Sequence, residues 1–207
     1  LFKNLGLVIV DEEQRFGVKQ KERFKEMRSE VDILALSATP IPRTLSLALT
    51  RLRDISLLRT PPPGRIPVKT FVLPYSTKII REAVQNEQKS GGQVYFLHNR
   101  VETLGLFQKK LETLLPYTEI RSVHGRMPEQ ELIRVMHDFR EKKFNVLLAT
   151  TIIENGLDLP NVNTLIVEDG TILGLAQAHQ LRGRIGRGDK ASYAYFLYRS
   201  RNLSEKA

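Results

Sequence analysis

Two carboxylates directly follow the first apolar run of the chain. Asp11 and Glu12 come after residues 7–10, and Gln14 stands two positions beyond Glu12. A short, unbroken apolar run is typical of a buried parallel strand, and parallel sheets bind ligands at their carboxyl edge. One carboxylate at that edge can bind Mg²⁺, directly or through water, and another can activate a water molecule that attacks a phosphate. An ordinary acidic loop would have the same residue types, so this motif alone leaves both interpretations open.

Small hydroxyl side chains follow a second apolar run, residues 33–36. Ser37 and Thr39 lie in this segment, which continues through two prolines to Arg43. Small residues allow a close approach of neighbouring loops, so the segment could connect a nucleotide site to a more distant one. Taken alone, it more simply indicates a turn that caps the next helix.

A third cluster follows the apolar run 146–149. Thr150 and Thr151 could donate hydrogen bonds to a phosphate, and Asp158, which follows Gly156, could contact a ribose or orient an arginine.

A fourth cluster, residues 180–188, contains Gln180, Arg184 and Arg187 among glycines. Glycine weakens helices, and the guanidinium group is a rigid fork that suits phosphate oxygens, so the spacing favours phosphate binding over a structural purpose. A basic surface turn is the alternative.

The elements that would position these clusters alternate between strand and helix. We expect strands at 7–10, 33–36, 68–73, 94–97, 120–123, 146–149, 164–167 and 193–198. Helical spacing of apolar residues follows the predicted cap Ser76, and it recurs at 104–114 and at 132–139. This alternation predicts an α/β fold with parallel sheets and helices on both faces. The strands at 7–10 and 33–36 are expected to be covered on both faces.

Composition limits the possible functions. Among 207 residues, 32 Lys and Arg exceed 23 Asp and Glu, for a formal net charge of +9, which permits a polyanionic partner. The chain has no cysteine, which excludes disulfides, thiolate zinc sites and cysteine nucleophiles. No apolar run approaches the roughly 20 residues of a membrane helix, and no signal peptide opens the chain. We therefore expect a cytoplasmic location and no membrane partner. Because the chain starts at Leu1 with a strand-like run, we also expect a piece of a longer protein.

The four clusters, in this order, resemble motifs II, III, V and VI of superfamily 2 helicases and translocases, and residues 96–100 stand where that superfamily has motif IV. Residues 11–18, 39–44 and 174–184 narrow the resemblance to two related families, the RecG helicases and the transcription-repair coupling factors (Mfd). The letters Asp-Glu-Glu-Gln at 11–14 are similar to the Mfd family, and RecG is the close alternative.

The resemblance implies two RecA-like lobes. Four prolines at 61–67 predict a stiff connector between them. We expect residues 1–60 to be the C-terminal half of the first lobe, 61–67 the linker and 68–198 a complete second lobe. Residues 199–207 would begin a translocation-motif region that the chain does not complete.

The resemblance also implies a role for each motif residue, with ATP and Mg²⁺ as cofactors. Asp11 would bind Mg²⁺, Glu12 would be the base, and Gln14 would contact the γ-phosphate region or relay across the cleft. Arg184 and Arg187 would be arginine fingers. The residues expected to bind ATP or couple it to DNA are Ser37, Thr39, Gly156, Asp158 and Gln180. Those expected to contact DNA are Asn99, Arg100, His124, Gly125, Arg126, Thr150 and Thr151. We give the histidines, His98 included, a structural interpretation by default.

The family's activity would be ATP-driven translocation on double-stranded DNA. In the Mfd family this displaces stalled RNA polymerase and recruits excision-repair proteins, through modules outside this chain. The Gly-Lys-Ser/Thr phosphate-binding loop is absent from these 207 residues, so we expect the chain alone to hydrolyse no ATP. A non-hydrolysing nucleic-acid-binding module is the remaining alternative. Another phosphate-handling enzyme, such as a small GTPase or a phosphatase, fits poorly without that loop or a nucleophilic cysteine.

Overall fold

The computed structural model describes residues 4–12, 16–27, 31–37, 56, 58, 60, 66–150, 161–186 and 190–199. The chain forms two compact units, Leu1–Leu58 and Arg59–Ala207. Of the described helices, none is both long enough and apolar enough to cross a bilayer.

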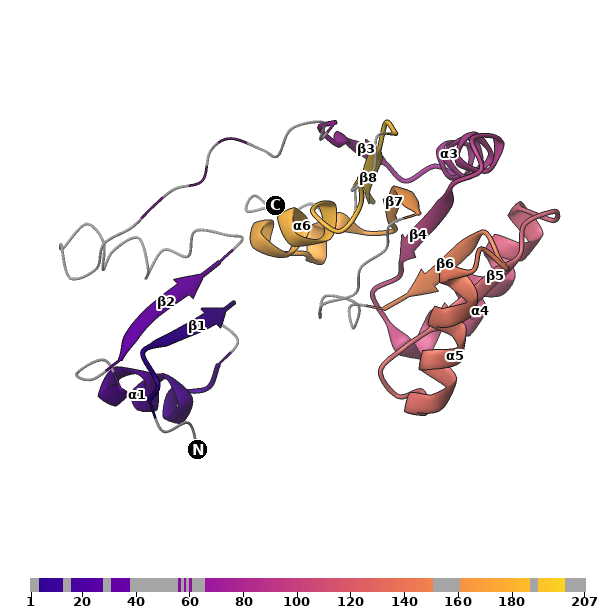
Figure 1. Ribbon diagram of the computed structural model, residues 1–207. Helices are drawn as coiled ribbons and strands as arrows, with labels where there is room; N and C mark the ends of the chain where they lie inside the picture. Colours follow the sequence, from indigo (N-terminus) through magenta and orange to yellow (C-terminus); the bar gives the residue numbers. More distant parts are fainter. Residues whose placement is uncertain are drawn as a thin grey trace. The chain divides into compact units, whose positions relative to one another are not determined.

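The described part of the first unit contains two parallel strands and a helix. Strand β1 (Leu7–Asp11) pairs with β2 (Asp32–Leu36), and α1 (Val18–Met27) connects them (Figure 1). The pairing register sets Asp11 opposite Leu36, so both strands end at the same level. The rings of Phe16 and Phe24 meet edge to face, with centroids 5.4 Å apart.

The expected burial of these two strands on both faces is wrong for the described part of the unit. Four apolar side chains are 44–60% exposed: Leu7, Ile9, Leu34 and Leu36. Only Val10 is buried, at 4% exposed. Side chains alternate between the two faces of a strand, and the exposed residues share one face. Apolar composition indicates that a face is suited to burial, but only a packed neighbour buries it.

The second unit is built on one six-stranded parallel sheet in the order β3-β8-β7-β4-β6-β5. Its strands, in chain order, are β3 (Lys69–Pro74), β4 (Gln93–Leu97), β5 (Ile120–Val123), β6 (Val146–Ala149), β7 (Val162–Val167) and β8 (Tyr193–Tyr198). The strand predictions for this unit are confirmed to within a residue or two at each end. The short apolar runs located them because β4, β6 and β7 are buried along their whole length.

Four α-helices and a short 3₁₀ helix are described in this unit. They are α3 (Thr77–Lys89), α4 (Val101–Leu114), α5 (Glu129–Arg140), α6 (Leu175–Arg182) and η3 (Gly170–Ile172). Ser76 is the N-cap of α3, as predicted, although its side chain makes no capping hydrogen bond. Pro128 precedes α5, whose acidic first turn and basic last turn suit the helix dipole.

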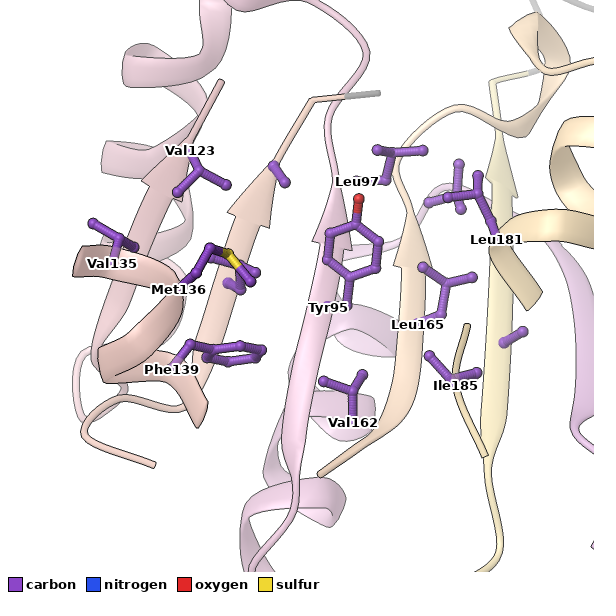
Figure 2. Close-up of a cluster of buried hydrophobic side chains, with 14 of the residues drawn as sticks. Tyr95, Leu97, Val123, Val135, Met136, Phe139, Val162, Leu165, Leu181 and Ile185 are labelled. Atoms are coloured by element: carbon purple, nitrogen blue, oxygen red, sulfur yellow. The ribbon is translucent and has the colours of Figure 1, made fainter. Parts of the chain in front are cut away.

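Two apolar cores lie on opposite faces of the sheet. One contains side chains of α3 and α4, such as Val84 and Phe107, against Phe96 and Leu148. Figure 2 shows the other core, in which Tyr95 and Leu165 project from the sheet among residues of α5 and α6. Because helices cover both faces, the edges of the sheet are where its loops can present polar groups.

Candidate functional site

The carboxyl edge of the first unit brings two predicted motifs together. The backbone N–H of Glu12 donates a hydrogen bond of 2.9 Å to the carbonyl oxygen of Leu36, the residue before Ser37. Asp11 and Ser37 are exposed and Glu12 is half-buried. The end of β1 and the end of β2 therefore present an acidic and a hydroxyl group side by side.

Glu12 has an unusual backbone conformation. Its φ of 54° lies in the left-handed region, which is uncommon for a residue with a side chain. Such a conformation costs on the order of 1 kcal/mol or more and tends to occur at functional sites. The hydrogen bond to Leu36 holds the backbone of Glu12 in place, so its carboxylate leaves the strand at a fixed point.

The carboxyl edge of the second unit collects the predicted DNA-contacting residues. Asn99 and Arg100 follow β4, His124 follows β5, and Thr150 follows β6. These three strands are neighbours in the sheet. The predicted site residues on this unit thus come from the ends of adjacent strands, as expected for a parallel α/β sheet.

Two polar atoms at this edge are buried without a partner. Asn99 donates from Nδ2 to the carbonyl oxygen of Asp169 at 2.8 Å, but its Oδ1 makes no hydrogen bond. Thr150 is 2% exposed, and its Oγ1 has no partner either. An unsatisfied buried polar atom costs about 1–3 kcal/mol, so a site that carries two of them is suited to receiving a polar ligand.

The turn after β5 is held by its own side chains. The Nδ1 atom of His124 accepts a hydrogen bond from the backbone N–H of Arg126 at 3.2 Å, and Arg126 forms an ion pair of 2.8 Å with Glu102. A hydrogen bond from the backbone of Glu102 itself lowers the pKa of the Glu102 carboxyl, and the hydrogen bond from Arg126 lowers it further. Both partners of the ion pair are largely exposed, so it contributes little to stability and can exchange for a phosphate.

A buried side-chain network lies at the same edge, and none of its contacts was predicted from the sequence. His98 bonds through Nδ1 to Glu168 and through Nε2 to Thr103, at 2.7 Å for the latter pair. Arg199 donates from Nη2 to the other oxygen of Glu168 at 2.9 Å. The default structural interpretation of His98 did not foresee these contacts. The available signal was that His98, Glu168 and Arg199 each directly follow a strand.

The arginine motif begins on α6. Gln180 lies on the helix, Arg184 follows it, and both are half-buried. Gly186 has a φ of +69°, and a Cβ atom there would lie 3.0 Å from Val68 Cγ2 and 3.1 Å from Ser192 Cβ. Our sequence interpretation favoured phosphate binding over a structural reason for the spacing of arginines and glycines, and the structure adds a structural reason for Gly186. Its backbone conformation and its close packing require glycine.

A largely apolar pocket of about 590 Å³ lies beside α6, between η3, β3 and β8. Val72, Leu173 and Phe196 line it, with His179 and Arg182 also in contact. None of the predicted site residues that the structure describes is among the residues that line this pocket.

Several predicted site residues lie outside the described part of the chain. They are Gln14, Thr39, Thr151, Gly156, Asp158 and Arg187. Their assignments stay predictions. In the described part of the chain, no three acidic or histidine side chains are grouped in a way that could hold a metal ion.

The family model for the helicase conserved C-terminal domain matches residues 76–189. The chain belongs to the helicase conserved C-terminal domain family. The match spans most of the six-stranded sheet and the predicted motifs IV, V and VI. The predicted RecA-like parallel fold is confirmed.

Curated relatives confirm the resemblance to the transcription-repair coupling factors. The chain is 54% identical to the transcription-repair-coupling factor of Escherichia coli over 95% of its own length and 17% of that relative. It is 48% identical to that of Borreliella burgdorferi over 99% of the chain and 18% of the relative. It is 51% identical to that of Bacillus subtilis over 96% of the chain and 17% of the relative. The chain therefore spans less than a fifth of the length of these relatives.

Solved structures are similar to both units. A structure of RecG bound to a three-way DNA junction matches with a TM-score of 0.74 and 36% identity, over 100% of this chain and 27% of that one. The L327V variant of Dbp5 from S. cerevisiae, in a structure with RNA and ADP BeF3, matches with a TM-score of 0.70 over 98% of this chain and 55% of that one. At 20% identity, the second similarity shows the fold alone.

Proposed function

We propose that the chain is the motor region of an ATP-dependent translocase that moves on double-stranded DNA. The observation that carries the proposal is the position of the motif residues. In each unit, those that follow described strands stand at the carboxyl edge of a parallel sheet, where such folds bind ligands. Identity near 50% with the transcription-repair-coupling factors supports the same conclusion.

The end of β1 suits the chemistry of ATP hydrolysis. Mg²⁺ prefers carboxylate and phosphate oxygens, and the exposed carboxylate of Asp11 is such a ligand. Bound there, the ion would supply charge neutralisation for the phosphates. Glu12, held by its backbone, is the proposed base that orients and deprotonates the attacking water. Gln14 is proposed to contact the γ-phosphate region, while Ser37 and Thr39 couple nucleotide binding to DNA.

The arginine motif of the second unit supplies positive charge. We assign Arg184 and Arg187 to the transferring phosphate, where their guanidinium groups would stabilise the charge that develops in the transition state. Gly156, Asp158 and Gln180 are assigned to ATP binding. The positive φ and the close packing of Gly186 support the assignment of Arg184, because they fix the backbone two residues after it.

The second unit also carries the proposed DNA contacts. Asn99 and Thr150 have unsatisfied polar atoms at the carboxyl edge, and Arg100 and Arg126 add exposed positive charge nearby. We include the turn residues His124 and Gly125, together with Thr151, in the same surface. Contact with the DNA backbone suits a motor, because phosphates are the same at every step.

The whole protein is proposed to act in transcription-coupled repair. The names of the curated relatives point to this process, in which the motor would displace stalled RNA polymerase and recruit excision-repair proteins. Those partners would bind elsewhere in the longer protein. The 207-residue chain alone is proposed not to hydrolyse ATP, because it contains no Gly-Lys-Ser/Thr loop.

The proposal is tested with the full-length protein and Arg187→Ala. We expect double-stranded DNA to stimulate ATP hydrolysis by the wild-type protein, and the variant to lose about 10³-fold or more of the stimulated rate. Its DNA affinity should change little. Arg134→Ala, an exposed arginine on α5, is the matched control and should behave as wild type. A wild-type protein that binds DNA without hydrolysing ATP would support the non-hydrolysing alternative.

A RecG-type activity is the second candidate, and the match to the RecG structure favours it. The two candidates differ in the substrate. A coupling factor should release RNA polymerase from a stalled elongation complex in an ATP-dependent reaction, and it should be weak at unwinding a three-way junction. Rapid junction unwinding without polymerase release would assign the chain to the RecG type.

A further inference from the structure

Two loop residues at the carboxyl edge of the six-stranded sheet, His98 and Arg199, bind the buried carboxylate of a third, Glu168. Glu168 follows β7 and is 8% exposed. One of its oxygens pairs with Nδ1 of His98, after β4, and the other accepts from Nη2 of Arg199, after β8, at 2.9 Å. The ends of three strands are therefore joined through a single side chain.

The network uses the hydrogen-bonding capacity of the histidine fully. Nδ1 of His98 must carry the proton that it donates to Glu168, while Nε2 pairs with the hydroxyl of Thr103 at 2.7 Å. The imidazole also stacks on Phe107, with ring centroids 4.7 Å apart. With both nitrogens bonded and one face packed, the ring has a single orientation.

Arg199 is held at its end of the network by two contacts, although its side chain is 51% exposed. Its guanidinium lies over the ring of Tyr75, 4.3 Å from the centroid, in addition to its bond with Glu168. Burial, and then the Glu168 carboxylate, raise the pKa of the Tyr75 phenol, whereas Arg199 lowers it. Glu168 thus fixes the point at which the chain leaves β8.

A second hydrogen bond joins the loops after β4 and β7, between the residues that follow His98 and Glu168. Asn99 follows His98, Asp169 follows Glu168, and the Asn99 amide donates to the Asp169 carbonyl at 2.8 Å. Arg100 comes next and is the N-cap of α4. The orientation of His98 therefore sets where the backbone of Asn99 and Arg100 lies.

We propose that Glu168 is a positioning residue for DNA binding, which holds the Asn99–Arg100 loop in its phosphate-binding geometry through His98 and ties that loop to the end of β8 through Arg199. The inference rests on the proposed function, because that function makes the loop a DNA contact. Glu168 itself touches no DNA. Its effect is on affinity for DNA, since the ATP chemistry is assigned to other residues.

The test uses the full-length protein and the dependence of ATP hydrolysis on DNA concentration. Glu168→Gln keeps the size of the side chain but removes the charge that His98 and Arg199 share. We expect it to raise the half-saturating DNA concentration about tenfold, the effect of losing one charge-assisted hydrogen bond. The rate at saturating DNA and the KM for ATP should stay unchanged. Glu141→Gln, on an exposed carboxylate after α5, is the matched control.

Variants of His98 and Arg199, the two partners of Glu168, test whether Glu168 acts on DNA affinity through them. His98→Ala should also weaken DNA binding, whereas His98→Asn should restore most of the affinity, because the asparagine amide can take the place of the Nδ1 donor. Arg199→Lys keeps the charge and should have a smaller effect than Arg199→Ala. If Arg199→Ala weakens DNA binding and Glu168→Gln does not, Arg199 itself contacts DNA and the proposal is wrong.

A purely structural network would give a different result. Lower thermal stability and a lower maximal rate, with an unchanged half-saturating DNA concentration, would overturn the positioning role. If the wild-type protein shows no DNA-stimulated ATP hydrolysis, the proposed function fails first. In that case ¹⁵N spectra of histidine-labelled chain still test the network. We expect one histidine with a protonated Nδ1 whose signal shifts in Glu168→Gln, and no such shift would refute the contact.

Discussion

The backbone N–H of Glu12 donates a hydrogen bond to the carbonyl oxygen of Leu36, at 2.9 Å, across the ends of two parallel strands. This bond places the proposed base directly beside Ser37, which belongs to the motif proposed to couple ATP to DNA. A movement of the end of β1 would therefore move the end of β2. Glu12 adopts a positive φ to make this contact, so its position is set by the backbone.

Replacement of Glu12 by glutamine should separate ATP binding from hydrolysis. In the full-length protein, we expect Glu12→Gln to bind ATP as the wild type does and to lose about 10²- to 10⁴-fold of its hydrolysis rate, because the amide cannot accept the proton of the attacking water. Nucleotide binding by fluorescence and phosphate release are the measurements.

The control for this variant is Glu22→Gln, an exposed carboxylate on α1. It has the same change of charge in the same unit and should hydrolyse ATP at the wild-type rate. An unchanged rate in Glu12→Gln would remove Glu12 from the role of base.

Thr150→Val should weaken DNA binding without destabilising the chain. The Thr150 hydroxyl is buried and makes no hydrogen bond, so valine, which has nearly the same shape, removes an unsatisfied group. We expect stability to stay the same or to rise by up to about 1 kcal/mol, while DNA affinity falls several-fold. Urea denaturation and fluorescence anisotropy with duplex DNA measure the two effects.

Thr164→Val is the matched control, and we expect the opposite result: lower stability with unchanged DNA affinity. The Thr164 hydroxyl donates to the buried carboxylate of Glu87 at the other edge of the sheet. Its loss should cost about 1–3 kcal/mol of stability and leave DNA affinity unchanged in the folded protein. Equal effects of the two variants on DNA affinity would contradict the assignment of Thr150.

Gly186→Ala tests the structural reason for the glycine in the arginine motif. The positive φ disfavours a side chain at this position, and a Cβ atom there would lie only 3.0–3.1 Å from atoms of Val68 and Ser192, which would have to shift. We expect the free energy of unfolding to fall by about 1–3 kcal/mol.

Gly105→Ala is the comparison for this change, because a Cβ at Gly105 meets nothing within 4 Å. It lies within α4, where alanine is the better helix former by about 1 kcal/mol, so this variant should be more stable than the wild type. Urea denaturation of both variants measures the difference. Similar destabilisation of both would show that crowding at Gly186 is not the cause.

The stability of the chain should depend on the ionisation of Asp138 in acid. A hydrogen bond from Lys143, and then one from Arg121, lower the pKa of the Asp138 carboxyl below its usual value. A group whose pKa is lower in the folded state stabilises the fold above the unfolded pKa, which is about 3.9 for Asp. That contribution is lost as the pH falls through the folded pKa.

Asp138→Asn should therefore unfold more easily than the wild type at neutral pH, and the difference should shrink as the pH falls below about 4. Denaturation with urea between pH 3 and pH 7, as rough limits, follows this change. Glu141→Gln should have the same free energy of unfolding as the wild type across this pH range. If the free energy of unfolding of Asp138→Asn differs from that of the wild type by the same amount at all pH values, the lost stability does not come from the ionised carboxylate.

The alternation of strands and helices could be predicted from the sequence because both faces of the larger sheet are covered. Residues such as Val146 and Leu148 must then be apolar on either side, which produces a short apolar run. The same reasoning failed for the exposed face of Leu7, Ile9, Leu34 and Leu36. Their composition does not reveal whether another element packs on them.

The motif residues could also be located from the sequence, because ligand-binding residues follow strands at fixed positions along the chain. Asp11, Glu12, Ser37, Asn99 and Thr150 each stand at or just after the end of a strand. Their partners could not be predicted. The bond between Glu12 and Leu36, and the one between Asn99 and Asp169, join residues far apart in the sequence.

The sequence by itself determined the parallel α/β class, the order of the motifs and the family. These depend on local apolar runs and on short strings of residues. Only the tertiary structure decided that Glu168 joins His98 to Arg199, that Gly186 must be glycine, and that the hydroxyl of Thr150 is buried without a hydrogen bond. The physical reason is that sheet order brings distant loops to one edge, and burial there makes each hydrogen bond, or its absence, energetically important.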